Sequence, residues 1–199
     1  MTKPQQYPSY PFVHLMPYHK GDSLDALAHA VKNNVPAVDW NFHVTKDNII
    51  VCTHWSQPLK HGWYDPKNLL KKDTLVWHMT WREVSRLRTK DGYRILTART
   101  MLSAAAKAGI RVEFEAKDSP GFVGTNGVHI FTRVKSLAKK KNLKITVKTL
   151  STLKGAPQRL SAAHDAGLTT LILPRGSRRL KRSKYWPCTD YVRGTVFWV

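Results

Sequence analysis

The sequence predicts an α/β fold with a parallel β-sheet, either closed into a barrel or doubly wound. Apolar segments of strand length alternate with segments of helical periodicity along most of the 199 residues, which is typical of strand–helix–strand units. Polar side chains also gather at or near the ends of the expected strands, and in (β/α) barrels the active site forms at that end. A chain of this length can bury a real core and fits one domain over residues 1–199.

The expected helices have clear start or stop signals. Ser23 offers an N-cap before apolar residues at helical spacing, and Pro36 follows the end of that helix. Residues 80–83 form a capping box that opens a helix, and Thr97 caps an alanine-rich helix that stops at Gly109. Two more helices are expected, one through 130–137 with the basic run 139–141 at its end and one over 157–166.

The strands are predicted from the short apolar or alternating segments between these helices. They are expected at 12–18, 37–45, 49–54, 110–117, 144–149, 169–173 and 191–199. The segments 55–76, 118–127 and 175–184 are expected to be loops, and the last of these is strongly basic.

One expected strand, 110–117, has an unusually polar face. Successive side chains of a strand point to opposite faces, so Glu113, Glu115 and Lys117 share one face. Burying such groups is costly unless they are paired or bind an ion. Glu115 with Lys117 fits an internal ion pair as well as it fits a site, and Glu113 is expected to have a structural role.

The strand over 37–45 repeats this design. Asp39, Asn41 and His43 share one face, and Trp40 and Phe42 share the other. Two strands with polar faces and apolar backs suggest oxygen ligands that converge on one pocket. The alternative is that Asp39 and Asn41 are hydrogen-bonded filling of a barrel interior, an alternative that is stronger for Asn41.

Charge and composition bound the partners. The formal net charge of +20 would attract polyanions or steer a phosphate-bearing substrate, although a solvated basic surface explains most of these lysines equally well. No apolar run is long enough to span a bilayer and no signal peptide is recognised, so a cytoplasmic location is expected. The two cysteines, Cys52 and Cys188, are expected to be free thiols in a reducing compartment.

Several motifs in chain order resemble the glycerophosphodiester phosphodiesterase family. They are His19-Lys-Gly21, Asp22-Ser23 opening a helix, Asp39-Trp-Asn41, the turn Val44-Thr-Lys-Asp47, His54-Trp55 and Glu115-Ala-Lys117. The resemblance covers most of the chain, and the turn with its flanking strands is its best local match.

The resemblance implies a TIM-type (β/α) barrel and a site for phosphodiester hydrolysis. It implies that Asp39, Asn41 and Glu115 bind a divalent cation, and Mg²⁺ or Ca²⁺ suits such oxygen ligands. It implies His19 and His54 as the acid–base pair, a role that suits a group titrating near neutrality. Phosphate contacts would come from Lys117 and from Lys20, which stands where the family has an arginine.

The chain also departs from the family pattern. Lys20 cannot make the bidentate phosphate contact of an arginine, and the neutral Asn41 weakens the attraction for a hard cation. The chain stops near the family's seventh strand, so the barrel is expected to be incomplete and to lack the last βα unit, or to be closed by a partner or an irregular segment.

Three functions are therefore predicted in order of preference. The first is a metal-dependent phosphodiester hydrolase that acts on glycerophosphodiesters or lipid head groups. The second is a catalytically degenerate barrel that serves as a binding or structural module. The third is a basic nucleic-acid-binding protein, for which affinity should fall steeply as salt rises.

Overall fold

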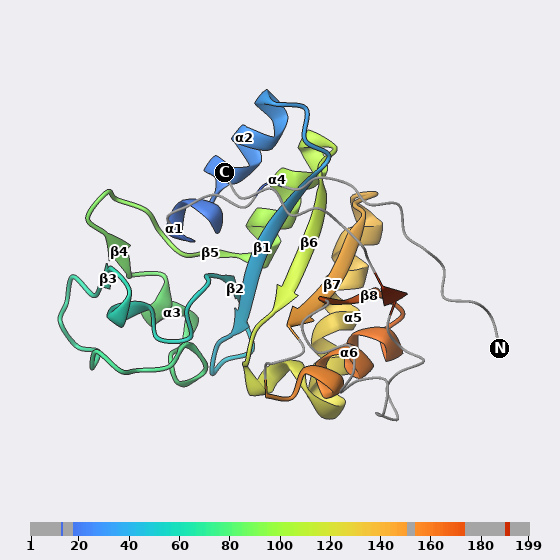
Figure 1. Ribbon diagram of the computed structural model, residues 1–199. Helices are drawn as coiled ribbons and strands as arrows, with labels where there is room; N and C mark the ends of the chain where they lie inside the picture. Colours follow the sequence, from blue (N-terminus) through green and yellow to red (C-terminus); the bar gives the residue numbers. More distant parts are fainter. Residues whose placement is uncertain (1–12, 14–17, 151–153, 174–189, 192–199) are drawn as a thin grey trace.

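The computed structural model describes residues 13, 18–150, 154–173 and 190–191, and it consists of a β-sheet with helices packed on one face (Figure 1). The sheet has seven strands in the order β5-β2-β1-β6-β7-β8-β9. The strands are β1 (Ala37–Val44), β2 (Ile50–Cys52), β5 (Leu96–Thr97), β6 (Arg111–Ala116), β7 (Ile145–Leu150), β8 (Thr169–Leu173) and β9 (Asp190–Tyr191).

Five strands of the sheet run parallel to one another, in the order β1, β6, β7, β8 and β9. The predicted α/β fold with a parallel sheet is therefore confirmed. Val13 forms a parallel bridge with Val38 of β1, which places this residue of the expected strand 12–18 beside β1. Residues 14–17 lie outside the described part of the chain.

Two of the four long helices begin at their predicted N-caps. Ser23 accepts a hydrogen bond from the backbone of Asp25 in the first turn of α2, and Thr97 accepts one from Thr100 in α4. Gly109 ends α4 in the left-handed conformation with φ of 68°, which glycine adopts without steric cost. The long helices are α2 (Leu24–Lys32), α4 (Ala98–Ala108), α5 (Gly124–Lys140) and α6 (Ala156–Asp165).

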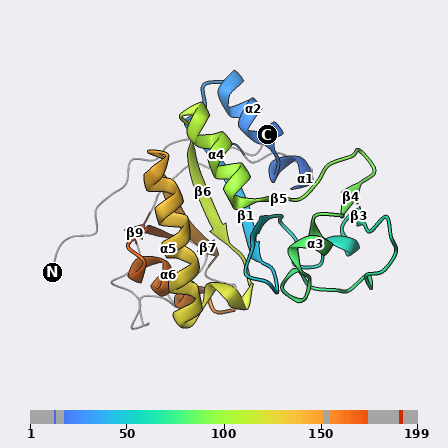
Figure 2. The same cartoon turned by 180° about the vertical axis from the view of Figure 1, so that it is seen from behind.

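The main core lies between the helices and one face of the sheet, as the reverse view shows (Figure 2). Trp40 and Phe42 of β1 and Phe114 of β6 are fully buried in it. The rings of Phe42 and Phe114 stack with their centroids 4.0 Å apart. Because the side chains of each strand alternate, this apolar face leaves the polar residues of the same strands on the opposite face.

The segment after β1 differs from simple strand–helix alternation. β2 runs antiparallel to β1, with Phe42 opposite Cys52. The connection is too short for the crossover that a parallel neighbour needs, and Asn48 adopts a left-handed conformation with φ of 61° in the turn.

The expected loop 55–76 contains short elements and belongs to a second, smaller core. Val51, Trp63, Met79 and Leu87 are among the buried residues of this core. The capping box at Thr80 is present, but its helix has only one turn. The elements between β2 and β5 are η1 (Pro58–Lys60), β3 (Trp63–Tyr64), η2 (Val76–His78), α3 (Trp81–Val84) and β4 (Arg88–Thr89).

Two predicted boundaries were wrong. Tyr18 begins a short helix, α1 (Tyr18–Gly21), and does not end the first strand. α5 begins at Gly124, inside the expected loop 118–127, after the short helix η3 (Pro120–Phe122). Glycines lower helix propensity, but Gly127 is needed there because a Cβ atom would lie 2.4 Å from the carbonyl oxygen of Phe122.

The basic segment 175–184 and most of the expected final strand 191–199 lie outside the described residues. The single domain over 1–199 therefore stays a prediction. In the described part of the chain, no helix has the length and apolar character that crossing a membrane requires.

We predict that Gly127→Ala destabilises the protein by about 1–3 kcal/mol, because the added methyl group meets backbone atoms that cannot easily move. Urea unfolding of the two proteins measures the difference. Gly109→Ala is the control, since its Cβ atom meets nothing within 4 Å and the substitution carries only the cost of a left-handed alanine, about 1 kcal/mol. A loss in Gly127→Ala no larger than in the control would contradict the close packing.

Candidate functional site

The candidate site lies on the polar face of the three central parallel strands. The strand register places Asn41 of β1 beside Glu115 of β6, and Glu115 beside Lys148 of β7. The preceding row places Asp39 beside Glu113. All five side chains are buried, so the structure gathers three carboxylates, an amide and an ammonium in a space from which water is largely excluded.

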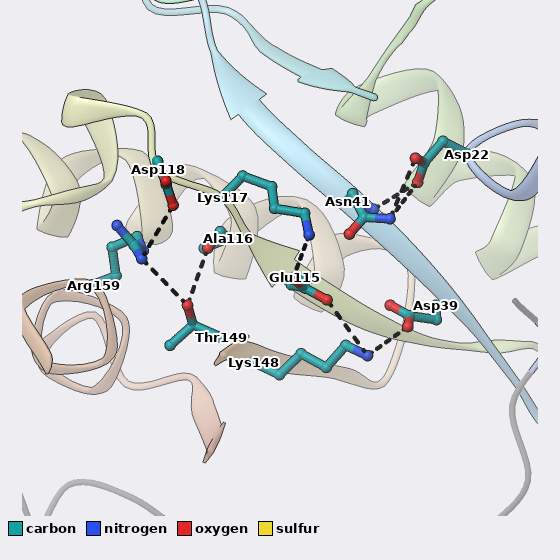
Figure 3. Close-up of polar contacts among 10 residues, drawn as sticks. All are labelled: Asp22, Asp39, Asn41, Glu115, Ala116, Lys117, Asp118, Lys148, Thr149 and Arg159. Atoms are coloured by element: carbon teal, nitrogen blue, oxygen red, sulfur yellow. Dashed lines mark hydrogen bonds and ion pairs between the residues drawn. The ribbon is translucent and has the colours of Figure 1, made fainter. Parts of the chain in front are cut away.

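Two lysines neutralise the carboxylates in this space (Figure 3). Lys148 Nζ donates a hydrogen bond to Asp39 Oδ2 at 2.6 Å and lies 3.9 Å from Glu115 Oε2. Lys117 Nζ donates to the other oxygen of Glu115, Oε1, at 2.6 Å. The ion pair of Glu115 with Lys117 is thus present, and Lys148 extends it to the neighbouring strand.

The charge of Lys148 is maintained by its surroundings. Burial alone would lower the pKa of its ammonium group, but the carboxylates of Asp39, Glu115 and Glu113 outweigh burial and raise the pKa above its ordinary value. The side chain is 2 % exposed. Lys148 is therefore a permanently charged cation inside the site.

Asn41 is held by a carboxylate that the sequence prediction did not include. Asp22 Oδ1 accepts hydrogen bonds from the backbone nitrogen of Asn41 at 2.7 Å and from its Nδ2 at 3.0 Å. Asn41 Oδ1 is buried, and no described residue donates a hydrogen bond to it. Asp22 thus fixes the amide so that its oxygen points away from Asp22 (Figure 3).

The two predicted acid–base histidines line one pocket. It has a volume of about 170 Å³ and is bounded by Tyr18, His19, Thr53, His54, Trp55, His61 and Trp63. The ring of His54 stacks on Tyr18 with centroids 3.8 Å apart. His19 Nε2 lies 3.5 Å from the carboxylate of Asp91.

The pocket adjoins the charged site through the backbone. The nitrogen of Thr53, next to His54, donates to the carbonyl oxygen of Asn41 at 2.9 Å. Lys20 follows His19 in α1 with a half-buried side chain, but it is not among the described residues that line the pocket. The structure thus places Asp39, Asn41, Glu115 and Lys117 on one face of the sheet and places His19 and His54 on a pocket beside it.

A third buried cation, Arg159, lies on the side of Glu115 away from Lys148 (Figure 3). The guanidinium of Arg159 in α6 lies 3.7 Å from Asp118 Oδ1 and donates to Thr149 Oγ1 at 3.4 Å. Arg159 was missed in the sequence because a single arginine in an amphipathic helix normally faces solvent. In the sequence, Lys148 is marked only by its place near the end of an expected strand, and Asp22 only by its place before a helix N-cap.

His43 is a neutral member of the polar face. Its Nδ1 lies 2.9 Å from Ser119 Oγ. Burial, together with the nearby charge of Lys117, lowers the pKa of His43 to about 3. His43 is therefore uncharged at neutral pH.

The oxygens of Asp39, Asn41 and Glu115 are chemically suited to a hard divalent cation, but their arrangement does not fit one. A Mg²⁺ or Ca²⁺ ion would need to lie about 2.0–2.6 Å from its ligand oxygens, and the Lys148 ammonium already lies 2.6 Å from Asp39 Oδ2. As the side chains lie, the ammonium group of Lys148 takes the position beside Asp39 that a metal ion would need.

We predict that His43 makes the protein less stable as the pH falls. Its pKa is about 3 in the folded protein and 6.5 when unperturbed, so between these values the unfolded chain binds the proton and folding loses about 1.4 kcal/mol per pH unit. In His43→Gln the free energy of unfolding, measured in urea from pH 4 to 6, should fall less steeply by that amount. His129→Gln, which alters an exposed histidine, should retain the wild-type slope, and an unchanged slope in His43→Gln would contradict the assignment.

Several solved structures are similar to this chain over most of its length. A protein of Silicibacter pomeroyi assigned to the glycerophosphoryl diester phosphodiesterases is similar with a TM-score of 0.59 and 16% identity, covering 95% of this chain and 91% of the other. A glycerophosphodiester phosphodiesterase of Parabacteroides distasonis has a TM-score of 0.55 and 15% identity, with coverages of 96% and 94%. An Oleispira antarctica phosphodiesterase in complex with the product sn-glycerol-3-phosphate has a TM-score of 0.54 and 14% identity, with coverages of 93% and 92%. No curated protein matched the sequence.

These similarities bear on the fold, and the predicted TIM-type (β/α) barrel is confirmed. The described strands do not show where the barrel closes, so the expected incompleteness of the barrel stays a prediction. The sequence model of one family matches residues 10–177, a span that contains every predicted site residue. The chain belongs to the glycerophosphoryl diester phosphodiesterase family.

Proposed function

We propose that this protein hydrolyses phosphodiesters of the glycerophosphodiester type, including those of lipid head groups. The observation that carries the proposal is the placement of His19 and His54 on one pocket that adjoins a buried cluster of lysines and carboxylates. A phosphodiester is an anion, so its hydrolysis needs fixed positive charge at the phosphoryl oxygens and a pair of groups that transfer protons.

The residues of the chain can supply both requirements. One of the two histidines accepts a proton from the attacking oxygen, and the other donates a proton to the leaving alkoxide. Lys117 holds a phosphoryl oxygen, and Glu115 positions Lys117 through their hydrogen bond of 2.6 Å. Lys20, at the end of α1, contributes positive charge at the entrance.

The requirement for Mg²⁺ or Ca²⁺ stays a prediction from the family resemblance. We assign no step to a metal, because Lys148 lies between the two carboxylates that would bind it. The cytoplasmic location also stays a prediction. The nucleic-acid alternative, which the net charge of +20 suggested, also stays a prediction, and the basic segment 175–184 lies outside the described residues.

A second candidate function has one observation in its favour. The lysines already neutralise Asp39 and Glu115, as they would in a barrel that binds a phosphate ester without cleaving it. Such a protein would bind sn-glycerol-3-phosphate in a calorimetric titration and would show no turnover of a diester.

We predict that purified protein releases sn-glycerol-3-phosphate from glycerophosphocholine and that His54→Ala lowers the rate about 10²-fold or more, as expected for a lost acid or base. His19→Ala should have a comparable effect. His129→Ala is the matched control, since it removes an exposed histidine of α5 on the helical side of the sheet.

The assay should be run with Mg²⁺, with Ca²⁺ and with a chelator. Absence of turnover under all three conditions, or turnover that is the same in His54→Ala as in the wild type, would refute the proposed function.

A further inference from the structure

Lys148 is the one feature of the site that the expected metal chemistry does not explain. It extends from β7 past β6 to a carboxylate of β1, which is two strands away in the sheet. A side chain of this length loses considerable conformational entropy when it is fixed, and burying its charge is costly unless the charge is well paired. Its contacts with Asp39 and Glu115 meet that condition.

The position of Lys148 Nζ is that of a cation shared by two acids. It lies 2.6 Å from Asp39 Oδ2 and 3.9 Å from Glu115 Oε2, and Figure 3 shows it between these two side chains. A metal bound to the same two oxygens would displace the ammonium into a buried space, where two like charges would repel strongly. Lys148 and a divalent cation therefore exclude one another.

We propose that the ammonium group of Lys148 is the built-in cation of this site and takes the place of a divalent metal ion between Asp39 and Glu115. The positive charge that faces a phosphate group then comes from Lys148 and Lys117. The proposal deepens the proposed function, on which it rests for the identity of the reaction site, and it makes the wild-type protein independent of Mg²⁺ and Ca²⁺.

The test is to remove the ammonium and to measure metal binding in the absence of substrate. In Lys148→Ala, Asp39 and Glu115 are left with space between them and lose a positive partner, so the protein should become less stable and should gain a site for a divalent cation. Mn²⁺, Ca²⁺ and Mg²⁺ are the probes, followed by calorimetric titration and by thermal unfolding. Saturating metal should raise the melting temperature of this variant by about 5 °C or more and should leave that of the wild type unchanged.

Two further variants serve as controls. Lys144→Ala makes the same change in charge at an exposed position just before β7 and should behave like the wild type. Lys148→Ala combined with Asp39→Asn should lose the gained metal site, because one of its two acids is gone. If Lys148→Ala does not fold, Lys148→Gln replaces it, since the amide can still donate a hydrogen bond to Asp39.

Measurements on the wild-type protein can overturn the proposal even if neither Lys148 variant folds. Stoichiometric binding of Mn²⁺ to the wild type that is lost in Glu115→Gln would overturn the proposal, as would a folded Lys148→Ala or Lys148→Gln variant that binds no metal. Turnover that strictly requires a metal would also overturn it while the proposed function stands. Turnover that continues in a chelator would support both the role of Lys148 and the proposed function. Absence of turnover would count against the proposed function alone, because the metal-binding measurements do not depend on it.

Discussion

The site depends on the mutual neutralisation of charges that are buried on one face of the sheet. Asp39, Glu115, Lys117 and Lys148 are each nearly inaccessible to solvent. An unpaired charge in such a place would cost several kcal/mol. Two hydrogen bonds of 2.6 Å, from Lys148 to Asp39 and from Lys117 to Glu115, offset that cost, and the first of them joins β7 to β1.

The fold makes this arrangement stable by dividing each central strand into two faces. The face formed by Trp40, Phe42 and Phe114 packs against helices and supplies the hydrophobic stabilisation. The opposite face then needs no large apolar contribution and can hold polar groups. The pairing of Asp22 with Asn41 shows the same principle at the edge of the site, where a carboxylate outside the strands satisfies the backbone and side chain of a buried amide.

Asn41 and Lys148 change the charge of the site in the same direction. Asn41 has no negative charge at the place where the family resemblance implies a metal ligand, and the buried ammonium group of Lys148 lies nearby. Both features make the site less attractive to a divalent cation and leave more positive charge for a phosphate group. His19 and His54 lie on an adjoining pocket. The proposed phosphate-directed function and the proposed role of Lys148 are therefore compatible in one structure.

Features that depend on local periodicity and local hydrogen bonds could be predicted from the sequence. The alternation in 37–45 and 110–117, the caps at Ser23 and Thr97 and the glycine that ends α4 all follow from neighbouring residues, as do the motifs that carry the family resemblance. Which charges meet could not be predicted in this way. Lys148 lies 109 residues from Asp39 and Asp22 lies 19 from Asn41, and these pairs depend on strand register and on how far a side chain reaches across the sheet. Register is set by hydrogen bonds between strands, and the order of residues along one strand does not contain that information.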